Sequence, residues 1–123
     1  MKRLPIVAVL LVLIALIGMP IYEKQRKQEI QHGKVLFQLH CCGCHNGRRT
    51  DLAKLPPNLS GIFQQPRLPS GAPATDGAVR SSVLVGRSDI MPSFRDSLDD
   101  EEIDTIILYL HSVGPETPAC TTN

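Results

Sequence analysis

The five residues Cys41-Cys42-Gly43-Cys44-His45 decide how this chain folds. Cys41 and Cys44 are separated by two residues, and His45 follows directly. Two thiols at this spacing lie on one turn of chain and can add across the two vinyl groups of one porphyrin, whose iron the imidazole then binds. The C-x-x-C-H pattern therefore predicts a covalently attached haem c, with Cys41 and Cys44 as attachment points and His45 as an iron ligand.

Two other uses of such a motif fit this chain less well. Structural zinc usually draws four ligands from two separated pairs, whereas His32, His40 and His111 form no second pair with Cys120. A thioredoxin-like redox motif requires a βαβ setting, and the helix-rich pattern of this chain offers none. We therefore expect haem rather than zinc or a redox-active thiol pair.

The composition indicates a small domain that needs a disulfide, a metal or a cofactor to be stable. The chain has 123 residues, of which 4% are aromatic and none is Trp, with ten Pro and nine Gly. A domain with so few large side chains usually needs disulfides, a metal or a cofactor as its nucleus. The formal net charge of +1 does not indicate a nucleic-acid partner.

The chain begins with an apolar segment. Leu4 to Tyr22 carries no charge, and a helix of that length spans about 28 Å, close to the hydrocarbon core of a bilayer. A cleaved signal peptide has a shorter apolar region and a small-residue cleavage site, so we favour a retained transmembrane anchor over residues 1–22. Residues 23–31 (EKQRKQEIQ) are polar helix formers and predict a helical stalk.

A domain over residues 30–114 should start with a helix that leads into the motif. Ile30, Gly33 and Phe37 recur at helical spacing, and the helix should end near His40. Glycine inside a helix costs about 1 kcal/mol relative to alanine. Gly33 therefore indicates a place where another helix crosses closely.

Two later segments predict further helices and give an all-α domain. Thr75 should cap a short helix that Gly86 ends. Ser97 should open a last helix that Gly114 stops. The last helix should bury an aliphatic stripe, Ile103, Ile106, Ile107 and Leu110. Residues 115–123 should form a flexible tail.

An iron bound by His45 has a second axial position. Met91 is the one methionine outside the apolar start, and it lies in a loop followed by proline. A thioether ligand favours reduced iron and raises its potential. We expect Met91 to be the second ligand; His32, His40 and His111 are the alternatives.

The order of these motifs resembles the small monohaem class I cytochromes c, over residues 30–113. CCGCH, PPNL and IMPSF follow one another between a first helix with Gly33 and a last helix with Tyr109. The resemblance implies a cytochrome c-like fold, with three to four helices around one covalent haem c. It also implies that the first and last helices cross, with Gly33 against Tyr109.

The resemblance gives a role to the proline loop as well. In the family this loop accepts a hydrogen bond from the ligand histidine. That bond would place the carbonyl of Pro57, or of Pro56, against His45 and make the imidazole a stronger donor to iron. Because haem is attached to c-type cytochromes outside the cytoplasm, the domain is expected on the periplasmic side of the cytoplasmic membrane.

By the same resemblance, the chain is a single-electron carrier rather than an enzyme. Its partners would be a cytochrome bc-type complex, a terminal oxidase or a periplasmic dehydrogenase. A second hypothesis is a haem c subunit fixed within one oxidase or dehydrogenase complex. A third is a haem enzyme or gas sensor with an open iron position, which requires that Met91 not bind.

The roles of the remaining cysteines and of the arginines stay open in the sequence. Cys42 is explained most simply as a small apolar residue of the haem loop. Alternatively, Cys42 and Cys120 form a disulfide that ties the tail to this loop. Guanidinium groups suit the haem propionates, and five are candidates: Arg48, Arg49, Arg67, Arg87 and Arg95.

Overall fold

The computed structural model describes residues 3–49, 51–52, 54–87 and 90–121. These residues include four α-helices and one short 3-10 helix, Ile62–Gln64, and no β-strand. The predicted all-α class is therefore confirmed. Residues 1–2 of the expected anchor and 122–123 of the expected tail lie outside the described residues.

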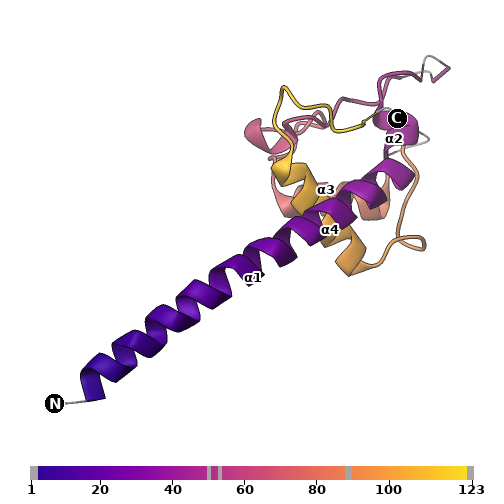
Figure 1. Ribbon diagram of the computed structural model, residues 1–123. Helices are drawn as coiled ribbons and strands as arrows, with labels where there is room; N and C mark the ends of the chain where they lie inside the picture. The colour runs from indigo at the N-terminus through magenta and orange to yellow at the C-terminus, as the bar shows by residue number, and fades with distance from the viewer. Residues whose placement is uncertain (1–2, 50, 53, 88–89, 122–123) are drawn as a thin grey trace.

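Helix α1 runs without a break from Arg3 to His40 (Figure 1). The anchor, the stalk and the first domain helix, which we predicted as consecutive segments, form this single element. Large apolar side chains between Ile6 and Tyr22 are 48% to 67% exposed. By its length and composition, α1 is suited to cross a membrane.

Helix α4, Asp100–Ser112, crosses the carboxyl-terminal part of α1 (Figure 1). Gly33 lies at the crossing. A Cβ atom there would lie 2.8 Å from the carbonyl carbon of Thr105 and 3.0 Å from the Cβ of Tyr109, so only glycine permits this approach. The ring of Phe37 packs against that of Tyr109, with 5.5 Å between centroids. The expected crossing of the first and last helices is confirmed.

The core lies where α1 and α4 meet. Phe37 is fully buried there on the α1 side. The predicted stripe of the last helix is buried in full, namely Ile103, Ile106, Ile107 and Leu110. Apolar burial of this kind stabilises a domain by roughly 25 cal/mol for each Å² removed from water.

Helix α3, Asp76–Val85, begins and ends as predicted from the sequence, whereas α4 does not begin where it was predicted to. The Thr75 hydroxyl accepts a bond from the first turn of α3, and Gly86 follows its last residue with a φ of 74°. Ser97 was expected to open the last helix, but Asp99 is its N-cap. Asp99 prevails because Glu102 completes a reciprocal capping box with it.

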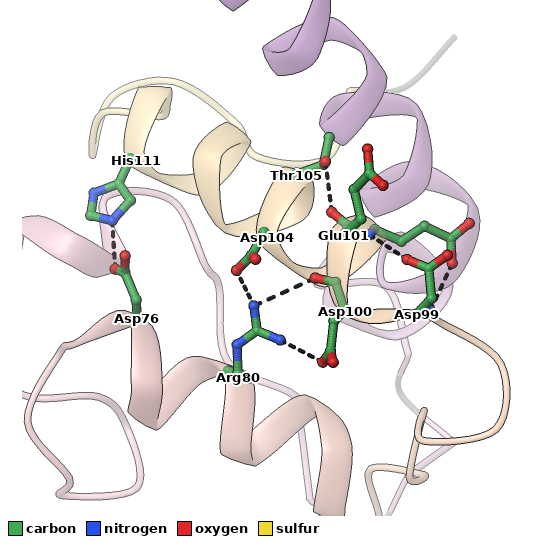
Figure 2. A network of polar contacts seen from close by, with 9 residues as sticks. Asp76, Arg80, Asp99, Asp100, Glu101, Asp104, Thr105 and His111 are labelled. Atoms are coloured by element: carbon green, nitrogen blue, oxygen red, sulfur yellow. Dashed lines mark hydrogen bonds and ion pairs between the residues drawn. The ribbon is translucent and has the colours of Figure 1, made fainter.

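Side-chain pairs hold α3 against α4, as Figure 2 shows. The Arg80 guanidinium lies between Asp100 and Asp104 of α4 and donates to both, at 2.9 Å from the Asp100 carboxylate. The His111 ring nitrogen Nε2 lies 2.7 Å from the Asp76 carboxylate. Because the carboxylates of these pairs are largely exposed, the pairs set the register of the two helices more than they stabilise the fold.

The predicted flexible tail is instead held in place at residues 119–121, so that part of the prediction is wrong. Ala119 is buried, and its carbonyl accepts a 2.7 Å hydrogen bond from the Tyr109 hydroxyl. The Ala119 N–H donates to the Ser60 hydroxyl at 2.9 Å. These bonds to the core outweigh the general tendency of chain ends to fray.

Candidate haem site

The CCGCH motif forms one helical turn directly after α1. Helix α2 spans Cys42–His45, and the N–H groups of Cys44 and His45 both donate to the Cys41 carbonyl, at 3.1 and 2.9 Å. Residues three apart on such a turn share one face. The side chains of Cys41 and Cys44 therefore project from the same side, as attachment to one porphyrin requires.

Cys41 and Cys44 are free thiols and are half-buried. Burial raises the pKa of the Cys41 thiol to about 12, and the neighbouring Cys44 adds to this. Cys41 therefore stays protonated at neutral pH. The Arg49 guanidinium lies 3.8 Å from the Cys44 sulfur and is paired with Asp51 at 2.7 Å.

Arg49 stands out among the five arginines weighed for the haem propionates. As far as the structure describes the chain, Arg49 is the one arginine of the five whose side chain donates a hydrogen bond to a side chain of the motif, that of Cys44. The Arg67 guanidinium instead donates to the Gly71 carbonyl, at 2.8 Å. The sequence offered no sign that separates Arg49 from the others, because its position depends on how the loop after His45 folds back.

The imidazole of His45 is oriented by the proline loop. Its Nδ1 lies 2.7 Å from the Pro57 carbonyl oxygen, so Pro57 rather than Pro56 makes the expected bond. Because a carbonyl only accepts, Nδ1 carries the proton and donates it. The other ring nitrogen, Nε2, then keeps its lone pair and is the atom able to bind a metal.

Met91 lies in a tight loop that closes on itself after α3. The Arg87 N–H donates to the Met91 carbonyl at 2.9 Å, and the Met91 N–H donates back at 3.1 Å. A Cβ on Gly86 would lie 2.5 Å from that Met91 carbonyl oxygen, so the loop fits only against glycine. The backbone of Met91 is thus fixed, and its side chain is half-buried.

Phe94 fixes this loop beside the motif. Its N–H donates to Val83 of α3 at 3.0 Å, and its ring meets the His40 ring edge-on, 6.2 Å between centroids. His40 immediately precedes Cys41, and Met91 lies three residues before Phe94. Three residues span at most about 10 Å, so the Met91 loop lies near the motif turn.

The histidines weighed against Met91 have other surroundings. The His111 ring stacks on Phe63 at 3.8 Å and is bonded to Asp76. His32 is exposed on α1. His40 is the one of the three that lies next to the motif, where it contacts Phe94.

The donor set fits a haem better than a bare metal ion. The described parts of the chain contain no group of three or more His, Cys, Asp or Glu side chains that could hold a metal ion. Large apolar side chains are exposed in the segments that carry the site residues: Leu39, Leu55, Val85 and Ile90. Leu39 and Leu55 lie two residues before Cys41 and Pro57, and Ile90 adjoins Met91. A porphyrin is the kind of broad apolar group that such side chains contact.

Cys42 and Cys120 form a disulfide, with 5.5 Å between their Cα atoms. The simpler explanation of Cys42, as a small apolar residue with a free thiol, is therefore wrong. That explanation was wrong because we also expected a flexible tail, whereas the folded tail brings Cys120 to the motif. The even number of cysteines was the available sign of this bond.

Comparison with known proteins agrees with this geometry. Residues 28–110 match the family model described as cytochrome c oxidase, cbb3-type, subunit III. The match begins in α1 and ends within α4, so it includes the motif turn, the proline loop and the Met91 loop. No curated protein and no solved structure matches the chain significantly.

Proposed function

We propose that this chain is a membrane-anchored single-electron carrier with one haem c. The proposal starts from its family, since the chain belongs to that of cytochrome c oxidase, cbb3-type, subunit III. Cys41 and Cys44 would attach the haem, and His45 and Met91 would bind its iron. When bound, haem c supplies an iron that takes up and releases one electron. The described residues serve to hold, orient and shield that group.

The observation that carries this proposal is the 2.7 Å contact between His45 Nδ1 and the Pro57 carbonyl oxygen. It selects the tautomer in which Nε2 is unprotonated, and it prevents the ring from rotating. Such a partner on the far nitrogen raises the basicity of a ligating histidine. A histidine that served only to pack would not need this fixed tautomer beside two free thiols.

The Met91 loop supports electron transfer rather than chemistry at an open iron position. Its backbone is closed by two hydrogen bonds and held through Phe94, so a thioether there is presented without reorganisation. A methionine ligand raises the reduction potential. If His45 and Met91 both bind the iron, it would have no open position for a substrate or a gas, as the enzyme and gas-sensor hypotheses require.

The membrane anchor sets where the carrier works. We place the apolar part of α1 in the cytoplasmic membrane and the haem domain on its periplasmic side. Anchoring confines the search for a partner to the membrane surface and so raises the effective concentration. A cytochrome bc-type complex, a terminal oxidase or a periplasmic dehydrogenase are the proposed partners.

A second candidate is a subunit fixed within one oxidase complex, and the shape of α1 favours it. No loop separates the apolar part of α1 from the motif. The eighteen residues from 23 to 40 would hold the haem turn roughly 27 Å from the membrane surface at about 1.5 Å per residue. A constant height of this kind suits a partner that presents its own redox centre at one level.

The test is the intact mass of the full chain purified from membranes, compared with the Cys41→Ala and Cys44→Ala variants. The proposal expects the wild-type mass to equal the chain plus one haem, retained under denaturing conditions. Each variant should keep at most one thioether bond and lose haem more readily. A wild-type chain without covalent haem would refute the proposal. Co-purification in a constant ratio with oxidase subunits would favour the fixed subunit over the carrier.

A further inference from the structure

The motif contains one more thiol than a C-x-x-C-H site uses. Cys41, Cys42 and Cys44 lie within four residues, yet the proposed attachment takes only two of them. In the structure Cys42 is bonded to Cys120, while Cys41 and Cys44 remain free thiols.

Besides the disulfide, hydrogen bonds of the residues on both sides of Cys120 hold the tail in place. Ala119 is buried and is bonded through its carbonyl and its N–H to Tyr109 and Ser60. On the other side, the Gln38 amide donates to the Thr121 hydroxyl. The tail therefore presents residue 120 at one point beside the motif turn.

The tail is also fixed where it leaves the core. Pro115 lies so close to Gly61 that a Cβ on the glycine would lie 2.8 Å from the Pro115 Cα. Gly61 has a φ of 66°, a conformation that favours glycine. The path from α4 to Cys120 is therefore determined at its start as well as at its end.

The helical turn separates Cys42 from the other two cysteines. Cys41 and Cys44 are three residues apart and share a face, whereas residue 42 is rotated by about 100° from residue 41. Cys120 therefore reaches Cys42 from a side that the Cys41–Cys44 face does not use. The neighbouring pair Cys41–Cys42 is a poor alternative disulfide, since Cα atoms about 3.8 Å apart are closer than disulfides prefer.

We propose that Cys120 is a specificity-determining residue for haem attachment: its disulfide removes the Cys42 thiol and leaves Cys41 and Cys44 as the pair that reacts. This inference rests on the proposed function. Without Cys120, the motif would offer three thiols to two vinyl groups. The Cys42 thiol could then replace its neighbour Cys41, or form a disulfide with Cys44.

The two reactions of the motif differ in their electron balance. Formation of the Cys42–Cys120 bond breaks two S–H bonds, and its two electrons and two protons pass to a protein disulfide oxidant of the extracytoplasmic compartment. Attachment of haem is redox-neutral. Each S–H adds across a vinyl double bond, so that sulfur bonds to one carbon and the hydrogen to the other.

The test compares three full-length forms made in a host that attaches haem c: wild type, Cys120→Ser, and the double variant Cys42→Ser/Cys120→Ser. Peptide mass mapping after alkylation, without reduction, identifies which sulfurs carry haem, which are alkylated and which form disulfides. We expect one wild-type species, linked at Cys41 and Cys44. Cys120→Ser should lose part of this species to products in which Cys42 is linked to haem or to Cys44. The double variant should return to a single species.

The double variant separates selectivity from simple stabilisation, because it lacks the same disulfide as Cys120→Ser. If both variants attach haem with equal fidelity, or lose holoprotein to the same extent, the disulfide is only a structural bond and the inference is wrong. A wild-type chain without covalent haem would instead overturn the proposed function, and this inference with it.

Discussion

The role of a single side chain in this protein depends on the groups that contact it. His45 can bind a metal through Nε2 because its Nδ1–H donates a hydrogen bond to the Pro57 carbonyl. Cys42 forms a disulfide with Cys120, whose neighbour Ala119 is hydrogen-bonded through both its N–H and its carbonyl. The partner of His45 is a backbone carbonyl and that of Cys42 is a side-chain sulfur. Both partners come from other segments of the chain, so the role of each side chain depends on the path of a loop or of the tail.

Tyr109 gives a prediction that depends on pH. Its hydroxyl donates to the Ala119 carbonyl at 2.7 Å, and burial raises its pKa above the ordinary value of 10.0. The unfolded chain therefore ionises this group first, so stability that is present below pH 10 is lost as pH rises through the folded pKa. Tyr109→Phe should lose about 1 kcal/mol at neutral pH and should not show this alkaline loss.

The measurement is the denaturant midpoint of the full-length holoprotein from neutral pH to above pH 10. Tyr22→Phe is the matched control, because Tyr22 is the other tyrosine and is exposed in the apolar part of α1. Equal midpoints for wild type and Tyr109→Phe at every pH would contradict the assignment.

Among the elements, α1 and α4 determine where the motif begins. α4 fixes α1 through Gly33, and α1 carries straight into the Cys41 turn. Any change that separates the two helices should therefore disturb the motif as well as the core. Two glycines allow the close contacts of these elements to be tested: Gly33 at the crossing of α1 and α4, and Gly86 between α3 and the Met91 loop.

Gly33→Ala should be strongly destabilising. Its Cβ would lie 2.8 Å from a backbone carbonyl carbon of α4, and backbone yields less readily than a side chain, so we expect a loss of about 1–3 kcal/mol or more. Gly77→Ala in the first turn of α3 is the control, because nothing lies within 4 Å of the added methyl. It should be neutral or stabilising by up to about 1 kcal/mol. Thermal unfolding of both holoproteins decides; similar shifts would contradict the close crossing.

Gly86→Ala should displace the Met91 loop without unfolding the core. Gly86 has a φ of 74° and a ψ of −171°, a region used almost only by glycine, and the new Cβ would meet the Met91 carbonyl. We expect partial loss of the Met–iron bond, seen as carbon monoxide binding to the reduced protein. Gly71→Ala is the control: it also has a positive φ, but open space surrounds it. If Gly86→Ala binds no more carbon monoxide than Gly71→Ala, the loop does not hold Met91.

At the scale of the whole molecule, the sequence predicted most of the features that depend on local pattern. The turn of CCGCH, the aliphatic stripe on α4, the Thr75 cap and the Gly86 stop all follow from spacing within a few residues. Contacts between distant segments were harder to predict. The Cys42–Cys120 bond and the packed tail join segments that are 78 positions apart in the sequence. Asp99 replaced Ser97 as the cap of α4 because two good capping residues lie close together.

The continuous α1 gives a prediction that separates a carrier from a fixed subunit. Seven residues of helix-forming sequence inserted into 23–31 lengthen α1 by about 10 Å and return the domain to nearly the same rotation. A carrier that searches the membrane surface should still support respiratory electron flow at the wild-type rate. A sharp loss of electron flow, with haem content unchanged, would show instead that the domain works at one fixed height.

The most direct test of the central claim is the absorption spectrum of the oxidised, full-length protein in the far red. A weak charge-transfer band there marks a bond between a methionine sulfur and ferric haem iron. We expect this band in the wild type and in Met19→Leu, a control in the apolar part of α1, and its loss in Met91→Leu. A wild-type protein without the band, or a band that survives Met91→Leu, would contradict ligation by His45 and Met91.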